Sequence, residues 1–133
     1  MAYVSKEDKQ RLLPGIKEVL NKYKMKGTVS VRNCSTLIVK VSKGVLDIMQ
    51  NSWEYDCNHT EFRKEKPQYL DVYGIEGAED GFTGNVHEFI RDLLAAMRGD
   101  QYFDKTNIQE DYFHCSHYYE IRIGDYKKPY ELI

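Results

Sequence analysis

The chain has 133 residues, of which 41% are hydrophobic and 13% aromatic. This length suits one domain, and the composition is too apolar for a disordered chain and too polar for a membrane protein. Residues 1–11 lack the apolar core of a signal peptide, so we expect a cytoplasmic protein with no membrane partner. Three widely spaced cysteines do not indicate a secreted disulfide framework.

The net charge is only -2, but the charges are unevenly distributed along the chain. Residues 1–43 carry ten Lys or Arg against three acids, whereas residues 44–133 carry nine against eighteen. This asymmetry has two interpretations. It is either a solvated basic helix on a mildly acidic body, or a polarised surface that orients the protein on a charged partner.

The pattern of residues 5–24 predicts a first helix. Ser5 resembles an N-cap with acids in the following turn, and apolar residues recur at helical spacing from Leu12 to Tyr23. Pro14 has no amide proton and would clash with the preceding turn. The helix therefore either kinks at Pro14 or begins near Leu13.

Period-two alternation then predicts two strands, around residues 28–32 and 36–41. The short link Asn33-Cys34-Ser35 makes them an antiparallel hairpin. Residues 44–51 suit a further strand or a short helix equally well. Residues 51–68 show no sustained period and are expected to form a long loop.

A strand over 69–73 and a turn-rich connection over 74–85 precede the clearest helix. In this helix Val86 to Met97 form an apolar stripe, Asn85 and Glu88 are placed as a capping box, and Gly99 ends it. Alternation over 117–123 predicts a last strand closed by Gly124. We therefore predict a single α+β domain over residues 1–133, with a mainly antiparallel sheet and two principal helices packed on one face.

Both ends of the chain resemble a group of uncharacterised bacteriophage proteins. The resemblance lies in Ser30 to Asn33 running into Ser35 to Val39, and in the tail from Asp111 to Tyr130. The hairpin also resembles a domain attached to large polyvalent proteins of phages and conjugative elements, although the chain departs from that domain's Trp-rich pattern after the hairpin. The resemblance implies a mobile-element origin, hence the cytoplasm of a bacterial host, and implies no catalytic residue.

Two Cys-x-His pairs are candidates for a metal site. Four such ligands can close a tetrahedral zinc site, but their spacing is unlike that of the usual zinc motifs. We therefore predict no metal and no other cofactor, and no catalytic residue is assigned. If zinc were bound, the ligands would be Cys57, His59, Cys115 and His117.

Two groups of residues are candidates for binding a partner. Basic residues of the N-terminal third would hold a nucleic-acid backbone through phosphate contacts: Lys17, Lys22, Lys24, Lys26, Arg32 and Lys40. Aromatic residues of the tail would form a contact surface for a protein, or would simply pack at the core edge: Tyr112, Phe113, Tyr118, Tyr119, Tyr126 and Tyr130.

These observations lead to three hypotheses. The first is a phage or mobile-element accessory protein that binds a host or phage macromolecule, expected to be a protein, and thereby antagonises a bacterial defence system. The second is a nucleic-acid-binding module that uses the basic N-terminal third. The third is a small metal-dependent enzyme built around His114, Cys115 and His117. A homo-oligomer is compatible with all three.

Overall fold

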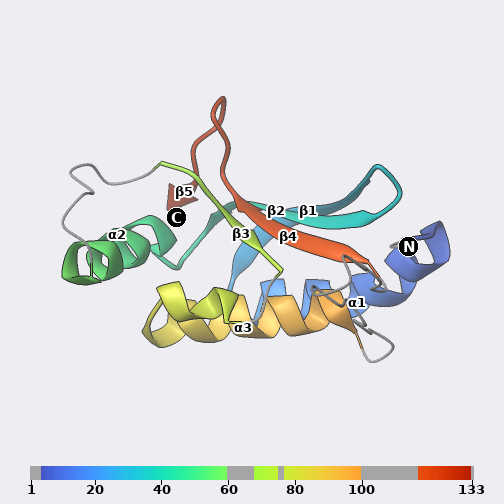
Figure 1. The fold of residues 1–133 in the computed structure, drawn as a ribbon, viewed down its shortest axis with the longest axis horizontal. Coiled ribbons are helices and arrows are strands. Elements are labelled where there is room, and N and C mark those ends of the chain that lie inside the picture. Colours follow the sequence, from blue (N-terminus) through green and yellow to red (C-terminus); the bar gives the residue numbers. More distant parts are fainter. Residues whose placement is uncertain (1–3, 60–67, 75–76, 100–116, 133) are drawn as a thin grey trace, which may run out of the picture.

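A computed structural model describes residues 4–59, 68–74, 77–99 and 117–132. They form a five-stranded sheet in the order β1-β2-β4-β3, with β5 pairing to β2. Helices α1 and α3 lie on one face of this sheet (Figure 1). In chain order the elements are α1 (Lys6–Lys22), β1 (Met25–Arg32), β2 (Thr36–Gly44), α2 (Ile48–His59), β3 (Leu70–Tyr73), the 3₁₀ helix η1 (Ala78–Gly81), α3 (Gly84–Arg98), β4 (Tyr118–Ile123) and β5 (Glu131–Leu132).

Helix α1 begins where the sequence predicts. The Ser5 hydroxyl accepts a hydrogen bond from the Asp8 amide at 3.0 Å, and the Ser5 amide donates to the Asp8 carboxylate at 3.1 Å, which completes a capping box. The helix then runs through Pro14 to Lys22. A start near Leu13, one of the two alternatives, is therefore wrong.

The predicted hairpin is confirmed as the antiparallel pair β1 and β2. Asn33 and Cys34 have φ angles of 54° and 57°, and the Ser35 amide donates to the Arg32 carbonyl at 3.2 Å. Two successive positive φ angles define a type I′ turn, whose twist matches that of the strands it joins. Strand β2 ends at Gly44, so the region 44–51 leads into helix α2 and does not form a further strand.

Helix α2 corrects the long loop expected over 51–68, because residues 51–59 are helical. Its start has a local signal that periodicity overlooks: the Asp47 carboxylate accepts from the Gln50 amide at 3.2 Å, as an N-cap residue does. Among its described side chains, the large apolar ones in the core are Ile48 and Met49 of the first turn. A helix with so few buried apolar positions shows no clear 3.6-residue period.

Helix α3 has the predicted apolar stripe, and all six of its members are buried: Val86, Phe89, Ile90, Leu93, Leu94 and Met97. The predicted capping box is wrong, because the N-cap is Thr83 and Asn85 lies inside the helix. The Asn51 side chain of α2 contacts Thr83: its amide nitrogen donates to the Thr83 hydroxyl at 3.0 Å, and its oxygen accepts from the Thr83 amide at 3.0 Å.

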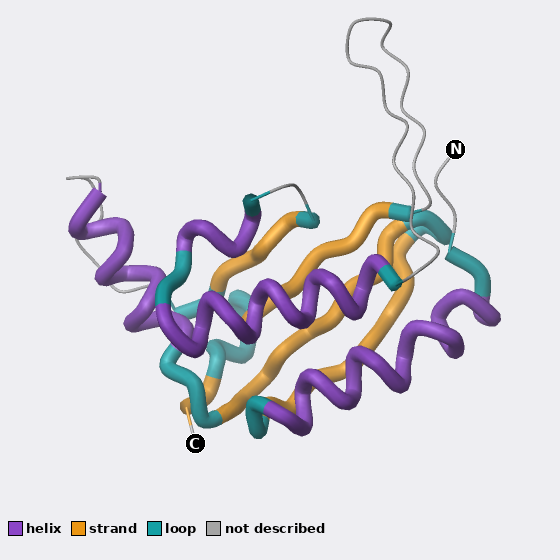
Figure 2. Tube along the Cα trace, turned by 90° about the horizontal axis from the view of Figure 1, so that it is seen from below, coloured by secondary structure: helices purple, strands orange, loops and turns teal. Residues whose placement is uncertain are grey.

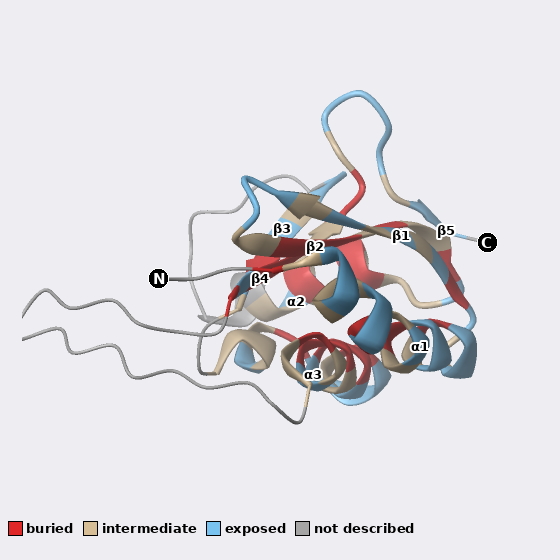
Figure 3. Ribbon diagram, turned by 90° about the vertical axis from the view of Figure 1, so that its right-hand side faces the viewer, coloured by how far each residue is buried: buried red, intermediate tan, exposed pale blue. Residues whose placement is uncertain are grey.

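The α+β class is confirmed, with β1–β2 and β3–β4 antiparallel and two principal helices on one face. The central pair, β2 and β4, is parallel. Figure 2 shows α1 and α3 lying over the strands, and the core lies between these two layers (Figure 3). Within the described ranges, no helix is both long and apolar enough to cross a membrane.

Candidate binding site on the open sheet face

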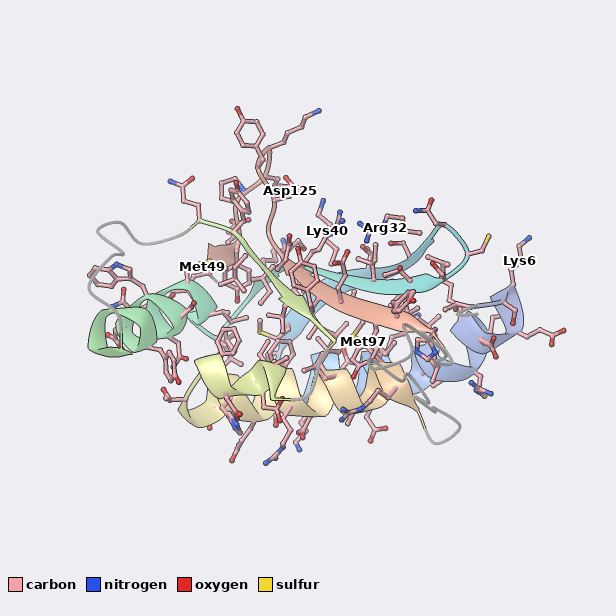
Figure 4. All side chains as sticks on the ribbon, in the orientation of Figure 1. Lys6, Arg32, Lys40, Met49, Met97 and Asp125 are labelled. Carbon is pink, nitrogen blue, oxygen red and sulfur yellow. The ribbon has the colours of Figure 1, made fainter. Side chains whose placement is uncertain are left out.

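The sheet has two chemically different faces because neighbouring residues of a strand point to opposite sides. On β4, Tyr119, Ile121 and Ile123 belong to the core beneath the helices. Among the described residues, no helix covers the other side, and Arg32 and Lys40 project from it, away from Met97 of α3 (Figure 4). We call this side the open face. Its strand residues include Lys26, Thr28, Ser30, Arg32, Thr36, Ile38, Lys40, Asp71, Tyr73, Tyr118, Glu120 and Arg122.

Strand register orders the open face into rows that run across the sheet. The first row pairs Arg32 with Thr36 and Thr36 with Tyr118. The second row contains Ser30, Ile38, Glu120 and Tyr73, and the third contains Thr28, Lys40, Arg122 and Asp71. Residues far apart in the sequence therefore become neighbours.

Glu120 is the centre of a charged network on this face. Its side chain is buried, and its Oε1 atom lies 3.3 Å from Nη1 of Arg32 and 3.1 Å from Nε of Arg122. The two arginine side chains remain 47% and 38% exposed. A buried carboxylate is tolerable when opposite charges and hydrogen bonds compensate it, and both arginines supply these. The network thus holds two guanidinium groups in defined positions at the surface.

A pocket of about 360 Å³ opens on the same face beside this network. Tyr73 and Tyr118 on its wall are 60% and 48% exposed. Gly74 belongs to the wall as well, and its amide donates to the Tyr119 carbonyl at 2.8 Å, which keeps the end of β3 against β4. The lining residues are Arg32, Thr36, Tyr73, Gly74, Tyr118, Tyr119 and Glu120.

The segment 124–130 rises from the sheet on the side opposite the helices (Figures 1 and 3). Asp125 organises it: one carboxylate oxygen accepts from the amides of Lys127 and Lys128 at 2.8 and 2.7 Å, and the other pairs with Lys40. The hydrogen bond from Lys40 is the main cause of the lowered pKa of Asp125. The turn presents Tyr126, Lys127 and Lys128 to solvent.

Gly124 starts this segment with a φ angle of 67°. A Cβ atom there would lie 2.4 Å from the backbone nitrogen of Tyr130. Both the positive φ and the close backbone approach require glycine. The conformation of the segment 124–130 is therefore fixed both by Gly124, where the segment begins, and by the hydrogen bonds of Asp125.

The basic residues proposed from the sequence do not form one cluster. Arg32 and Lys40 lie on the open face, together with Arg122, which the sequence analysis did not select. Lys17 and Lys22 belong to α1 in the helix layer, and Lys22 pairs with Asp92 of α3 at 3.6 Å. The other two are exposed at the start of the hairpin: Lys24, with a φ angle of 56°, and Lys26 of β1.

The proposed tyrosine surface is divided as well. Tyr112 and Phe113 lie outside the described residues. Tyr118 and Tyr126 are exposed, whereas Tyr119 is buried in the core. The Tyr130 hydroxyl donates to the Leu46 carbonyl at 2.6 Å, and burial raises the pKa of Tyr130.

Of the four possible zinc ligands, only His117 has a described side chain. Cys57 and His59 belong to α2 without described side chains, and His114 and Cys115 lie outside the described ranges. His117 is buried, and its Nε2 lies 2.9 Å from the Met97 carbonyl, which can only accept, so Nε2 carries the proton. Across the part of the chain with described side chains, no three His, Cys, Asp or Glu residues gather as a metal site would require.

The sequence analysis did not select several residues of the site, among them Tyr73, Glu120 and Arg122. Glu120 and Arg122 do alternate with the apolar residues of β4, so a sheet-face position was recognisable. Glu120 and Arg122 become neighbours of Arg32 and Tyr73 through the order of the strands in the sheet. The alternation within a strand gives no information on that order. In comparisons with known proteins, no family model, curated protein or solved structure matches the chain.

Proposed function

We propose that the protein is an accessory protein of a phage or other mobile element that acts by binding a host or phage macromolecule through its open face. Its origin rests on the resemblance of the hairpin and tail to phage proteins. Antagonism of a bacterial defence system is the biological role to be examined first. The observation that carries the binding proposal is the pocket in which exposed Tyr73 and Tyr118 stand beside the Glu120 network.

The chemistry of this face supports binding. Tyrosine combines a large apolar ring with a polar tip, and both tyrosine and arginine are frequent where binding energy is concentrated. Glu120 already orients Arg32 and Arg122. Ordered guanidinium groups lose less conformational entropy when a ligand arrives, so more of the interaction energy remains as affinity.

The test is affinity purification of the tagged full chain from infected bacteria, with mass spectrometry and nucleic-acid detection on one eluate. Three forms are compared: the wild type, the open-face double variant Tyr73→Ser with Tyr118→Ser, and Lys17→Gln on α1. We expect a macromolecule that copurifies with the wild type and with Lys17→Gln and is lost from the double variant. An eluate that is the same for all three forms would remove the proposal.

A further inference from the structure

We infer that the macromolecule bound by the open face is a single-stranded nucleic acid, with bases on Tyr73 and Tyr118 and phosphates at Arg32 and at Lys127 and Lys128. This inference rests on the proposed function, because it names the ligand of the same site. It differs from a site made by the basic N-terminal third, since Lys17 and Lys22 of that set belong to α1 in the helix layer.

The two tyrosines are placed as neighbouring stacking platforms. Tyr73 pairs with Glu120 across β3 and β4, and Tyr118 precedes Glu120 by two residues on the same side of β4. Diagonal neighbours of this kind lie about 7–8 Å apart, within reach of large rings. Successive bases of a single strand can separate and stack on such rings, whatever their sequence.

Arg32 lies where a phosphate would follow the bases. It shares a row with Thr36 and Tyr118, two strand spacings from the tyrosine, which corresponds to about 10 Å. Its Nη1 contacts Glu120. A guanidinium group has five N–H donors, so donors remain for a phosphate while Glu120 keeps the group in place.

The segment 124–130 extends the cationic side of the site. It rises beside the open face and presents Tyr126, Lys127 and Lys128 to solvent (Figure 3). Asp125 is already paired with Lys40 and with two amides, and Glu120 with two arginines. Asp125 and Glu120 are thus compensated, Asp71 lies opposite Arg122 in the register, and the two lysines add positive charge that matches a phosphate backbone.

Charge and shape favour this ligand over duplex DNA and over a protein. Duplex bases are stacked inside the helix and cannot lie on Tyr73 or Tyr118. The centre of a protein interface is depleted of lysine and of acidic residues. Here the central rows contain Glu120 and Lys40. A single strand offers both an unpaired base and a phosphate to such a surface.

The experiment is fluorescence anisotropy of the purified full chain with labelled oligothymidine and oligouridine of about 15 nucleotides. Titrations are made between about 50 and 200 mM salt, and a duplex of equal length is the competitor. We expect the single strands to bind with salt-dependent affinity and the duplex to compete poorly. Comparison of the two oligonucleotides distinguishes DNA from RNA as the source of the same chemistry.

The variants separate stacking from general charge. Tyr73→Ser and Tyr118→Ser each weaken binding about tenfold, whereas Tyr73→Phe and Tyr118→Phe retain the ring and the affinity. Arg32→Gln lowers the slope of log affinity against log salt by about one. Lys17→Gln removes the same charge from α1 and leaves both affinity and slope unchanged. Circular dichroism of each variant verifies folding.

Two results would overturn the inference. One is the absence of oligonucleotide binding at about 50 mM salt. The other is an equal loss of oligonucleotide affinity in Lys17→Gln and Arg32→Gln. That result would show that binding depends on the overall charge of the protein and not on the open face. If oligonucleotides fail to bind but the double serine variant loses a protein partner in the purification, the proposed function stands and this inference falls. If the double variant loses nothing, both fall.

Discussion

The two faces of one sheet show how differently neighbouring residues can be used. On β4, Ile121 is fully buried against the helix layer, whereas Arg122 beside it is partly exposed on the open face. The covered face contains apolar side chains that pack with α1 and α3. The open face contains charges, two exposed tyrosines and a pocket. Stability and the proposed binding therefore depend on alternate positions of the same strands, and substitutions should separate them.

The largest difference is expected between Ile121→Ala and Arg122→Ala. Ile121 has no exposed surface, so its truncation leaves a cavity and should lower the free energy of unfolding by about 2–5 kcal/mol. Arg122 is a partly exposed ion-pair partner, and its truncation should cost at most about 1 kcal/mol. Urea unfolding followed by circular dichroism measures both values. Equal costs would contradict the division between the two faces.

The second prediction compares tyrosine hydroxyls in the two layers. The Tyr23 hydroxyl donates to the Asp92 carboxylate at 2.7 Å and so joins α1 to α3. Tyr23→Phe should cost about 1–2 kcal/mol at neutral pH, because the lost bond is to a charged group. Tyr118→Phe on the open face should change stability by less than about 0.5 kcal/mol. Chemical denaturation of the three proteins tests this order.

This bond also predicts a pH dependence. The hydrogen bond that the Tyr23 hydroxyl donates to Asp92 is the main cause that raises the pKa of Tyr23 from 10.0 to about 12. The unfolded state therefore ionises first, so the stabilisation is complete below pH 10 and is lost as the pH rises towards 12. The pKa of Asp92 is lowered, mainly by Tyr23, so its contribution is lost as the pH falls below the ordinary value of 3.8.

The stability difference between wild type and Tyr23→Phe should narrow at both extremes of pH, and should be largest at neutral pH. Denaturation curves of the two proteins at matched pH values give this difference directly. A difference that stays constant from neutral pH to pH 12 would show that the hydroxyl contributes through packing alone.

A small effect on stability is also expected for Glu120→Gln. The carboxylate is only 3% exposed, yet its partners Arg32 and Arg122 reach solvent and can be hydrated when the charge is removed. Glutamine also avoids the cost of burying a charge. We expect a loss below about 1 kcal/mol in urea unfolding. A loss of several kcal/mol would mean that the network stabilises the fold and not only the arrangement of the arginines.

Local sequence patterns determined most of the elements. The Ser5 capping box, the buried stripe of α3 and the alternation of β4 each depend on residues a few positions apart, and such patterns can be recognised without knowledge of tertiary contacts. Helix α2 was not predicted because, among its described side chains, the large apolar ones in the core belong to its first turn. The local sequence feature that marks the start of α2 is its N-cap residue, Asp47, and an N-cap residue does not contribute to hydrophobic periodicity.

The candidate site was decided by the tertiary structure. The sequence identified Arg32 and Tyr118 separately, as a basic residue and as a tail tyrosine. Only the parallel pairing of β2 with β4 places them in one row, and only the pairing of β3 with β4 brings Tyr73 beside Glu120. Alternation tells which residues of a strand share a face, but not which strand lies beside it or which face the helices cover. Those depend on how α1 and α3 bury their apolar sides, a choice made by the whole chain at once.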